Sequence, residues 1–321
     1  MPLGNVRSGV RRDGRMRVSR ALRQRAYEPA LASPRIALVA AAALAALVGG
    51  GGAHAFGLTA LDLRLVGDSN PAKAEFDEDI EASTSLTARL GVNLFGDTLA
   101  ETSRITRGYS VDVSLGYGQD FDIEGLGESV YRLSAGFVHE SKARAFAPFY
   151  RVGVGVSWID SETDIRDGPS IDVAGSVNFQ PSPFFDTTFG VGLESRQAET
   201  DVFDTTKARA FLTANFSPAS RFVLRSGVRV IAGNEVSTAT PTLAIVGSAD
   251  AIEADSAFGG FRANRFAYLI DAVSVILEAG VGYELTQTVQ TNFLYRFVDT
   301  QADGDIAYRR GLAELTVSME F

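Results

Sequence analysis

Cysteine is absent from the 321 residues, and histidine occurs only twice, at His54 and His139. The missing thiols exclude a disulfide framework and any zinc site built on cysteine. The shortage of histidine argues against a histidine-rich metal or catalytic centre. A hydrophobic content of 45% and an aromatic content of 10% exclude a typical disordered chain.

Long apolar runs are also missing. The run at 36–48 has 13 residues, too short for a membrane-crossing helix, which needs about 20. It follows a stretch rich in arginine and precedes small residues that end in Ala53-His54-Ala55. This order is typical of a secretory signal peptide. We therefore expect residues 1–55 to be cleaved and 56–321 to form the exported domain; a twin-arginine signal and an N-terminal anchor stay open as alternatives.

Removal of this segment changes the charge balance. Residues 56–321 keep 21 basic and 37 acidic side chains, a net charge of −16. Nucleic-acid binding relies on clustered lysine and arginine. The exported domain is therefore a poor candidate for a nucleic-acid partner.

Apolar and polar residues alternate with a period of two after residue 55, which predicts strands with two different faces. In the clearest case, 80–94, the even-numbered positions are apolar or small and the odd ones mainly polar. A membrane-spanning strand needs about 9–11 residues, a length that this segment exceeds. Similar strands are expected at 109–117, 131–137, 150–158, 171–179, 189–193 and 273–283, weaker ones at 58–66, 207–216, 221–231 and 288–298, and the last at 312–321.

Only one face of these strands is apolar, so nothing would fill the core of a soluble β-sandwich. The pattern predicts an all-β fold, a transmembrane antiparallel up-and-down β-barrel. Counting strands back from the C-terminus gives twelve. The segment 232–271 contains an apolar piece at 243–246 and an aromatic piece at 258–268. A hairpin there would raise the number to fourteen.

The chain ends in a strand whose alternate residues, Leu315, Val317, Met319 and Phe321, are apolar. This end resembles the C-terminal strand of bacterial outer-membrane β-barrel proteins, of the porin-like type or the autotransporter type without a passenger. The resemblance implies that these four residues are an assembly signal read by the barrel-assembly machinery. It also implies a place in the outer membrane, in contact with lipid and lipopolysaccharide. The termini would then lie in the periplasm and the long acidic loops outside.

The inward-facing positions collect charges of both signs, which must be hydrated or paired. They allow either a water-filled pore whose charged rings select solutes or a cross-linked plug. Inward glycines leave space and favour a narrow pore, with 232–271 as a constriction. The pore-lining candidates are Arg89, Arg132, Arg151, Arg196, Arg209, Arg225, Arg229, Arg296, Asp112, Asp172, Glu194, Glu278 and Glu314.

The function that we predict is a porin-like passive channel for small hydrophilic solutes, without cofactor or bound metal. An enzyme is not expected, because His139 falls at a strand end on the lipid or interfacial side. A translocator is disfavoured because residues 56–57 lead directly into the first strand. A non-conducting structural or adhesive barrel that acts through acidic outer loops is the alternative. The solute, the selectivity and the oligomeric state stay open.

Overall fold

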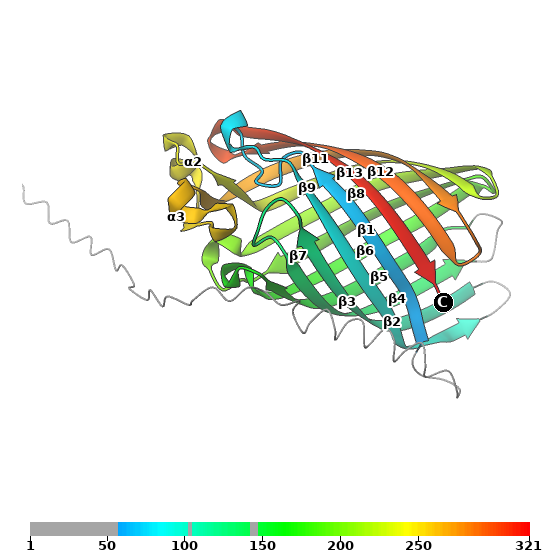
Figure 1. Cartoon of the computed structure of the whole chain (residues 1–321). Coiled ribbons are helices and arrows are strands. Elements are labelled where there is room, and N and C mark those ends of the chain that lie inside the picture. Colours follow the sequence, from blue (N-terminus) through cyan, green and yellow to red (C-terminus); the bar gives the residue numbers. More distant parts are fainter. Residues whose placement is uncertain (1–56, 102–104, 142–146) are drawn as a thin grey trace, which may run out of the picture.

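The structure, a computed structural model, describes residues 57–101, 105–141 and 147–321. The expected signal peptide lies outside these ranges. Twelve strands of the described chain form one closed antiparallel barrel, because β9 pairs with β11 as well as with β8 (Figure 1). The barrel strands are β1 (Gly57–Asp68), β2 (Ser83–Glu101), β3 (Ile105–Asp120), β4 (Glu128–Ser141), β5 (Phe149–Ser161), β6 (Gly168–Ser182), β7 (Phe185–Arg196), β8 (Thr205–Ala219), β9 (Phe222–Ala239), β11 (Phe266–Glu284), β12 (Val289–Ala302) and β13 (Ile306–Glu320).

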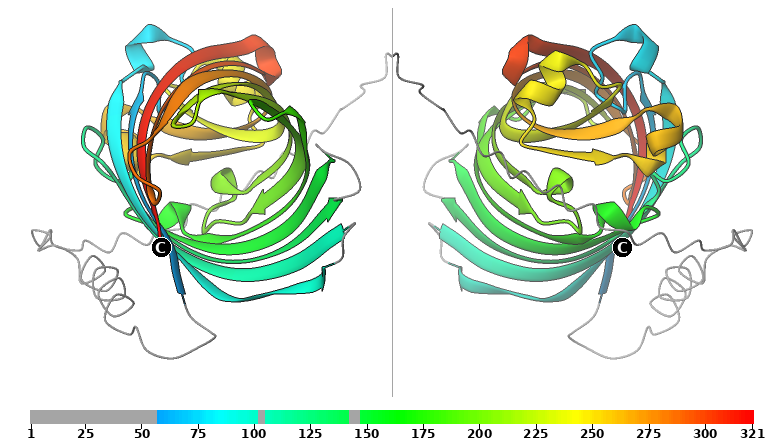
Figure 2. Two further views of the ribbon diagram at one scale, coloured as in Figure 1. Left: turned by 90° about the vertical axis from the view of Figure 1, so that its right-hand side faces the viewer. Right: turned by 90° about the vertical axis from the view of Figure 1, so that its left-hand side faces the viewer.

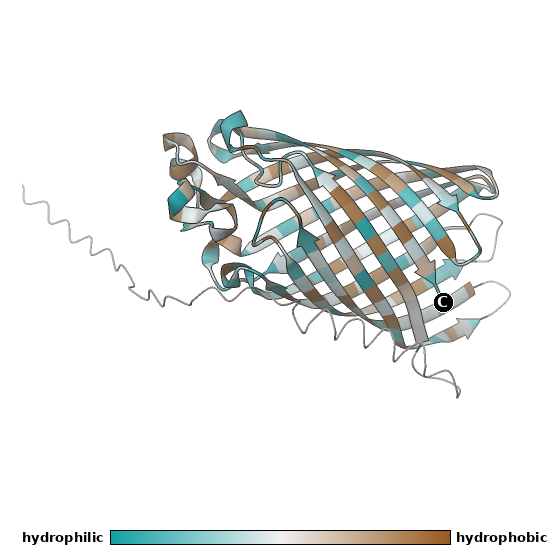
Figure 3. Ribbon diagram, viewed as in Figure 1, coloured by the Kyte–Doolittle hydropathy of each residue, from teal (hydrophilic) through white to brown (hydrophobic). Residues whose placement is uncertain are grey.

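Hydrophobic and hydrophilic residues alternate along the strands, as the bands of colour show (Figure 3). On β5, Val152, Val154 and Val156 are 41–55% exposed although they are apolar. On β11, burial alternates residue by residue from Ile270 to Ala279. Successive side chains of a strand point to opposite faces, so the exposed apolar set covers the outside and the polar set lines the lumen. The prediction of an all-β, twelve-stranded antiparallel barrel is confirmed.

The two ends of the barrel differ. One end, the turn end, carries the connections 183–184, 220–221 and 285–288. Strand β1 begins at this end and β13 ends there. The other end, the loop end, carries the longer connections 69–82, 121–127, 162–167, 197–204 and 240–265. The long, folded loops therefore all lie at the loop end, whose opening we call the mouth.

Among the described residues, no helix is long and apolar enough to cross a membrane.

The expectation of a fourteen-strand alternative at 232–271 is wrong. Strand β9 continues to Ala239 and β11 begins at Phe266, so the connection is only 240–265. Within it, the apolar piece forms the helix α2 (Leu243–Ser248), whose N-cap Thr242 accepts a hydrogen bond from the Ile245 amide. The one additional strand, β10 (Ala251–Ala254), has four residues and pairs with β11 alone. It is too short to become a wall strand.

Other strand boundaries also differ from expectation. The strand expected at 80–94 begins instead at Ser83 and continues to Glu101, with bulges after Asn93 and Thr98. An extra residue at each bulge shifts the alternation, so the period-two pattern stops in the sequence while the strand goes on. The gap between the strands expected at 288–298 and 312–321 shrinks to 303–305, because Gly304 and Asp305 adopt positive φ and close a tight turn.

The connection 240–265, which we call the cap segment, also contains the short helix α3 (Gly260–Ala263). It connects β9 to β11, and the ends of these two strands that it joins extend beyond the neighbouring strands. Strand β8 pairs with β9 only as far as Gly233, and β12 pairs with β11 only from Ala272. We call the part of the β9–β11 hairpin beyond these residues the hairpin extension. Gly233 has a φ of 135°, which suits glycine and marks the point where β9 leaves β8. The cap segment lies across the mouth, within the outline of the barrel (Figure 2).

Two small apolar cores hold this extension. One face of the hairpin, with Tyr268 and Ile270, packs on Ala72 and Ala74 of the loop 69–82 and on Ile245 of α2. The opposite face, with Ala267 and Leu269, packs on residues 202–203 of the β7–β8 loop. The hairpin is thus covered on both faces, so it crosses the mouth as a buried partition.

Candidate functional site: the lumen and its capped mouth

One side of the lumen carries a belt of alternating ion pairs across β1, β13, β12, β11 and β9. Arg64 lies 2.7 Å from Glu314, which also binds Arg296 at 2.6 Å. Arg296 and Arg229 then share Glu278, at 3.4 and 3.8 Å. Each belt carboxylate faces two guanidinium groups, so the charged side chains of this wall pair with one another.

The opposite side encloses a lumen cavity of about 540 Å³ between β3 and β8. Arg132 forms a bidentate pair with Asp172 there, Nη1–Oδ1 at 2.6 Å and Nη2–Oδ2 at 2.9 Å. Asp112 accepts hydrogen bonds from Asn93 and Ser110, at 2.7 and 2.9 Å. Arg151 and Arg209 also line this cavity. The cavity therefore combines one neutralised pair with further charges that neutral groups or solvent must stabilise.

The remaining candidates occupy inward register positions at other depths. Arg89 donates to Ser114 Oγ at 3.2 Å, and Arg225 donates to Asn215 Oδ1 at 3.1 Å, near the turn end. Arg196 donates to the Arg166 carbonyl, near the mouth, where Glu194 and Arg196 line a smaller pocket of about 160 Å³. The structure thus spreads the thirteen residues over the inner wall: eleven fall into the belt, the cavity and the mouth, and Arg89 and Arg225 lie apart from these groups.

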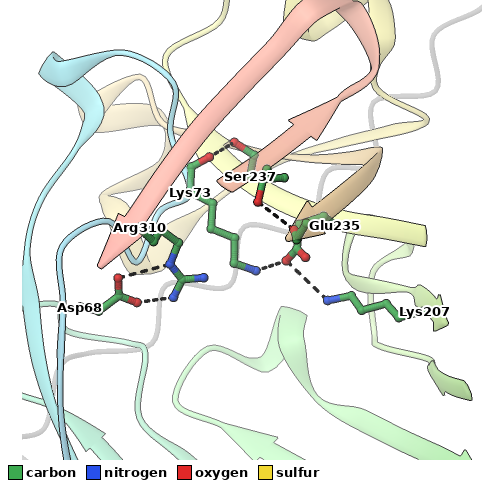
Figure 4. Close-up of polar contacts among 8 residues, drawn as sticks. Asp68, Lys73, Lys207, Glu235, Ser237 and Arg310 are labelled. Carbon is green, nitrogen blue, oxygen red and sulfur yellow. Dashed lines mark hydrogen bonds and ion pairs between the residues drawn. The ribbon is translucent and has the colours of Figure 1, made fainter. Parts of the chain in front are cut away.

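A second ion cluster lies at the mouth beside the hairpin extension (Figure 4). The Lys73 ammonium pairs with Glu235 of β9, which also faces Lys207 of β8 at 3.4 Å. Beside them, Arg310 of β13 holds Asp68 of β1. Burial lowers the pKa of Lys73 to about 8, against the opposing effect of Glu235. The loop 69–82 therefore places a marginally protonated amine inside the mouth.

Two buried carboxylates fasten the cap segment. Asp79, 2% exposed, accepts from the Thr240 amide and hydroxyl at 2.7 and 2.8 Å and pairs with Arg265. It therefore binds the first and the last part of the cap segment at the same time. Asp255, fully buried, accepts from the Thr238 hydroxyl at 2.6 Å and pairs with Arg166 at the same distance. The segment is a fixed part of the mouth.

Sequence reasoning missed this group of Lys73, Asp79, Lys207, Glu235 and Asp255. Lys207 shares the inward parity of Arg209, so the alternation on β8 contained the signal. Glu235 was assigned to a loop because the end of β9 was placed too early. Lys73, Asp79 and Asp255 lie in connections without periodicity, and only tertiary packing reveals them.

The acidic loops are largely structural. Asp120 accepts from the amides of residues 122 and 123, Asp167 from the Ser161 amide, and Glu162 from the Gly125 amide. A carboxylate that satisfies backbone donors fixes the loop that carries it. The described residues contain no group of three or more acidic or histidine side chains placed to hold a metal ion.

The residues of the terminal motif and His139 lie on the outer side. Leu315 is 46% exposed, Val317 and Met319 share its register, and Phe321, just beyond β13, is 63% exposed. His139 accepts a hydrogen bond from Arg107 Nε at 3.1 Å and lies beside Tyr150. It shares the outward register of Phe137 on β4, away from the lumen.

No protein-family model matches the sequence, and neither does any curated protein. The structure is similar to an outer membrane channel from Pseudomonas putida F1, with a TM-score of 0.51 and 11% identity over 85% of this chain and 98% of that chain. Lesser likenesses are to the NanC porin, with a TM-score of 0.44 and 8% identity over 81% and 100% of the chains, and to the transport unit of the autotransporter AIDA-I from Escherichia coli, with 0.40 and 10% over 90% and 99%. At such identity the first likeness is one of fold, and the chain has the fold of a twelve-stranded outer-membrane β-barrel.

Proposed function

We propose that the protein is a porin-like passive channel for small hydrophilic solutes. The observation that carries this proposal is the polar lumen cavity of about 540 Å³ inside a wall whose outer face is apolar. A barrel of about eight strands is filled by its side chains, whereas one of about sixteen encloses an aqueous channel. With twelve strands, the side chains decide. Here Gly155, Gly190 and Gly192 make room for Arg132, Phe211 and Arg209 of the neighbouring strands to lie close to the wall.

The orientation is part of the proposal. Both barrel termini meet the short connections at the turn end, and the long folded loops meet at the other end. Short periplasmic turns and longer extracellular loops are usual for outer-membrane barrels. We place the turn end in the periplasm, where the strand ending in Phe321 would engage the assembly machinery, and the cap segment at the cell surface beside lipopolysaccharide.

The cap segment sets the expected size of the channel. It lies across the mouth and is fastened by Asp79 and Asp255. It contacts the loops of the wall from β3 to β8, with Ala257 beside Gly125 and Asp255 paired with Arg166. A solute would pass through the pocket of about 160 Å³ that remains beside it at the mouth. The channel should therefore conduct weakly and exclude large solutes.

The test is single-channel recording of the protein purified from outer membranes of an expressing bacterium, in a planar bilayer with a salt gradient. Discrete current steps with a defined reversal potential are expected. A correctly folded barrel that stays silent would overturn the channel proposal. That result would favour a structural or adhesive barrel, because the capped mouth would then act as a seal.

A further inference from the structure

The charges that line the lumen cavity do not cancel. Arg132 and Asp172 neutralise each other through the bidentate pair. Asp112 contributes one negative charge, and its carboxylate oxygens are already engaged by Asn93 and Ser110. Arg151 and Arg209 contribute two positive charges and have no ion-pair partner among the described residues. The cavity therefore carries a net positive charge, with two guanidinium groups that lack a counter-ion.

The position of Arg209 follows from the glycines of the neighbouring strand. A Cβ built on Gly192 of β7 would lie 2.8 Å from Arg209 Nε, so the guanidinium arm of β8 lies over this glycine. Phe211, two residues further on β8, covers Gly190 in the same way. The missing side chains thus let a cation and an aromatic ring lie flat along one wall, side by side.

The paired wall across the lumen gives the contrast. There, each guanidinium of the belt has a carboxylate within 3.8 Å. A solute anion would have to displace such a partner. In the cavity, the donors of Arg151 and Arg209 need no displacement, apart from a contact between Arg151 and the Phe149 ring at 5.5 Å. A guanidinium group presents paired N–H donors that match the two oxygens of a carboxylate.

We propose that this cavity is a binding subsite for a small organic carboxylate. The carboxylate would accept hydrogen bonds from one of the two unpaired guanidinium groups, that of Arg209 or that of Arg151. The organic part of the solute would lie in the cavity beside Phe211, whose ring also has Arg229 at 6.0 Å. The inference deepens the proposed channel function by naming the solute class. The net charge of the cavity disfavours a cation, because Asp172 is paired with Arg132 and the single further carboxylate, Asp112, faces two unpaired guanidinium groups across the cavity lining.

The test is calorimetric binding of benzoate and of benzamide, its neutral isostere, to the purified full-length barrel in detergent. Benzoate is expected to bind at least about tenfold more tightly, since a hydrogen bond to a charged group is worth about a factor of ten or more. The double variant Arg151→Gln/Arg209→Gln should lose this preference. Arg221→Gln, which removes one exposed positive charge at the turn end, is the control and should retain it.

Further variants keep the outcome decisive. Arg209→Lys preserves the charge but not the paired donors and should give an intermediate affinity, with circular dichroism confirming the barrel in every variant. Equal affinity for benzoate and benzamide, or full benzoate affinity in the double variant, would overturn the subsite. A silent barrel that still binds benzoate through the two arginines would refute only the channel. A conducting barrel without benzoate preference would refute only the subsite.

Discussion

Replacement of Asp255 by alanine should loosen the cap segment while the barrel stays folded. The Asp255 carboxylate is fully buried and accepts from the Thr238 hydroxyl, the Arg166 guanidinium and the Ala257 amide, at 2.6, 2.6 and 3.2 Å. It ties the cap segment to β9 and to the β5–β6 loop at once. Its removal leaves Arg166, whose side chain is 19% exposed, without its counter-charge.

The magnitude follows from the burial. Removing one partner of a buried ion pair costs about 3–5 kcal/mol, because the other charge remains desolvated. Since about 1.4 kcal/mol corresponds to a tenfold change in an equilibrium constant, opening of the cap segment should become at least about a hundredfold more frequent. The barrel ladder should not share this loss, because the pairing of β9 with β8 ends at Gly233, before Thr238 is reached.

Hydrogen exchange measured by mass spectrometry separates the two effects. Amides of 240–265 should exchange about a hundredfold faster in Asp255→Ala, whereas those of 222–232 should keep the rate of the parent protein. Asp250→Ala is the matched control, since Asp250 lies exposed in the same segment. Unchanged exchange in the cap segment, or an equal acceleration over the whole barrel, would refute a local role for Asp255.

Three further predictions concern the mouth, the belt and the C-terminus. Lys73 should lose its proton near pH 8, read by NMR of its ¹³C-methylated amine; because the unfolded chain keeps that proton up to about pH 10.5, stability should rise with pH across this window relative to Lys73→Met. A midpoint near 10.5 would contradict the buried environment. Glu278→Gln deprives Arg229 and Arg296 of their shared counter-ion and should lower the free energy of unfolding by up to about 3–5 kcal/mol in urea titrations; an unchanged midpoint would show that the belt adds no stability. Deletion of Phe321 should reduce the amount of barrel in outer-membrane fractions, and normal assembly would count against an assembly signal.

The sequence predicted the barrel because each wall strand has lipid-suited residues on one side only. Alternation at 150–158 assigned Arg151 to the inner wall without knowledge of its neighbours, since a strand side chain has just two directions to point. The same rule gave the inward positions of Arg229, Glu278 and Arg296. Their pairing into a belt was not predictable, because it depends on the register between strands far apart in the chain.

The start of β11 in the hairpin extension escaped prediction for a physical reason. Residues 266–270, Phe-Ala-Tyr-Leu-Ile, form a continuous apolar run rather than an alternating one. Such a run is typical of a strand that is buried on both faces. Tyr268 and Ile270 are covered by the loop 69–82, and Ala267 and Leu269 by the β7–β8 loop. Because this part of β11 is buried on both faces, its sequence lacks the alternation of apolar and polar residues that identified the rest of the strand.

The distribution of arginine partners separates stability from solute recognition within one lumen. Arg296 has Glu278 and Glu314 within 3.4 Å, so its guanidinium group pairs with carboxylates of the wall and stabilises the fold. Arg209 lies over Gly192 with no carboxylate partner among the described residues, so its donors remain for a solute. Mutation of a belt residue should therefore change the unfolding free energy, and mutation of Arg209 the affinity for benzoate. If both kinds of variant altered both quantities equally, the lumen would be a single coupled network and the division between the two walls would be wrong.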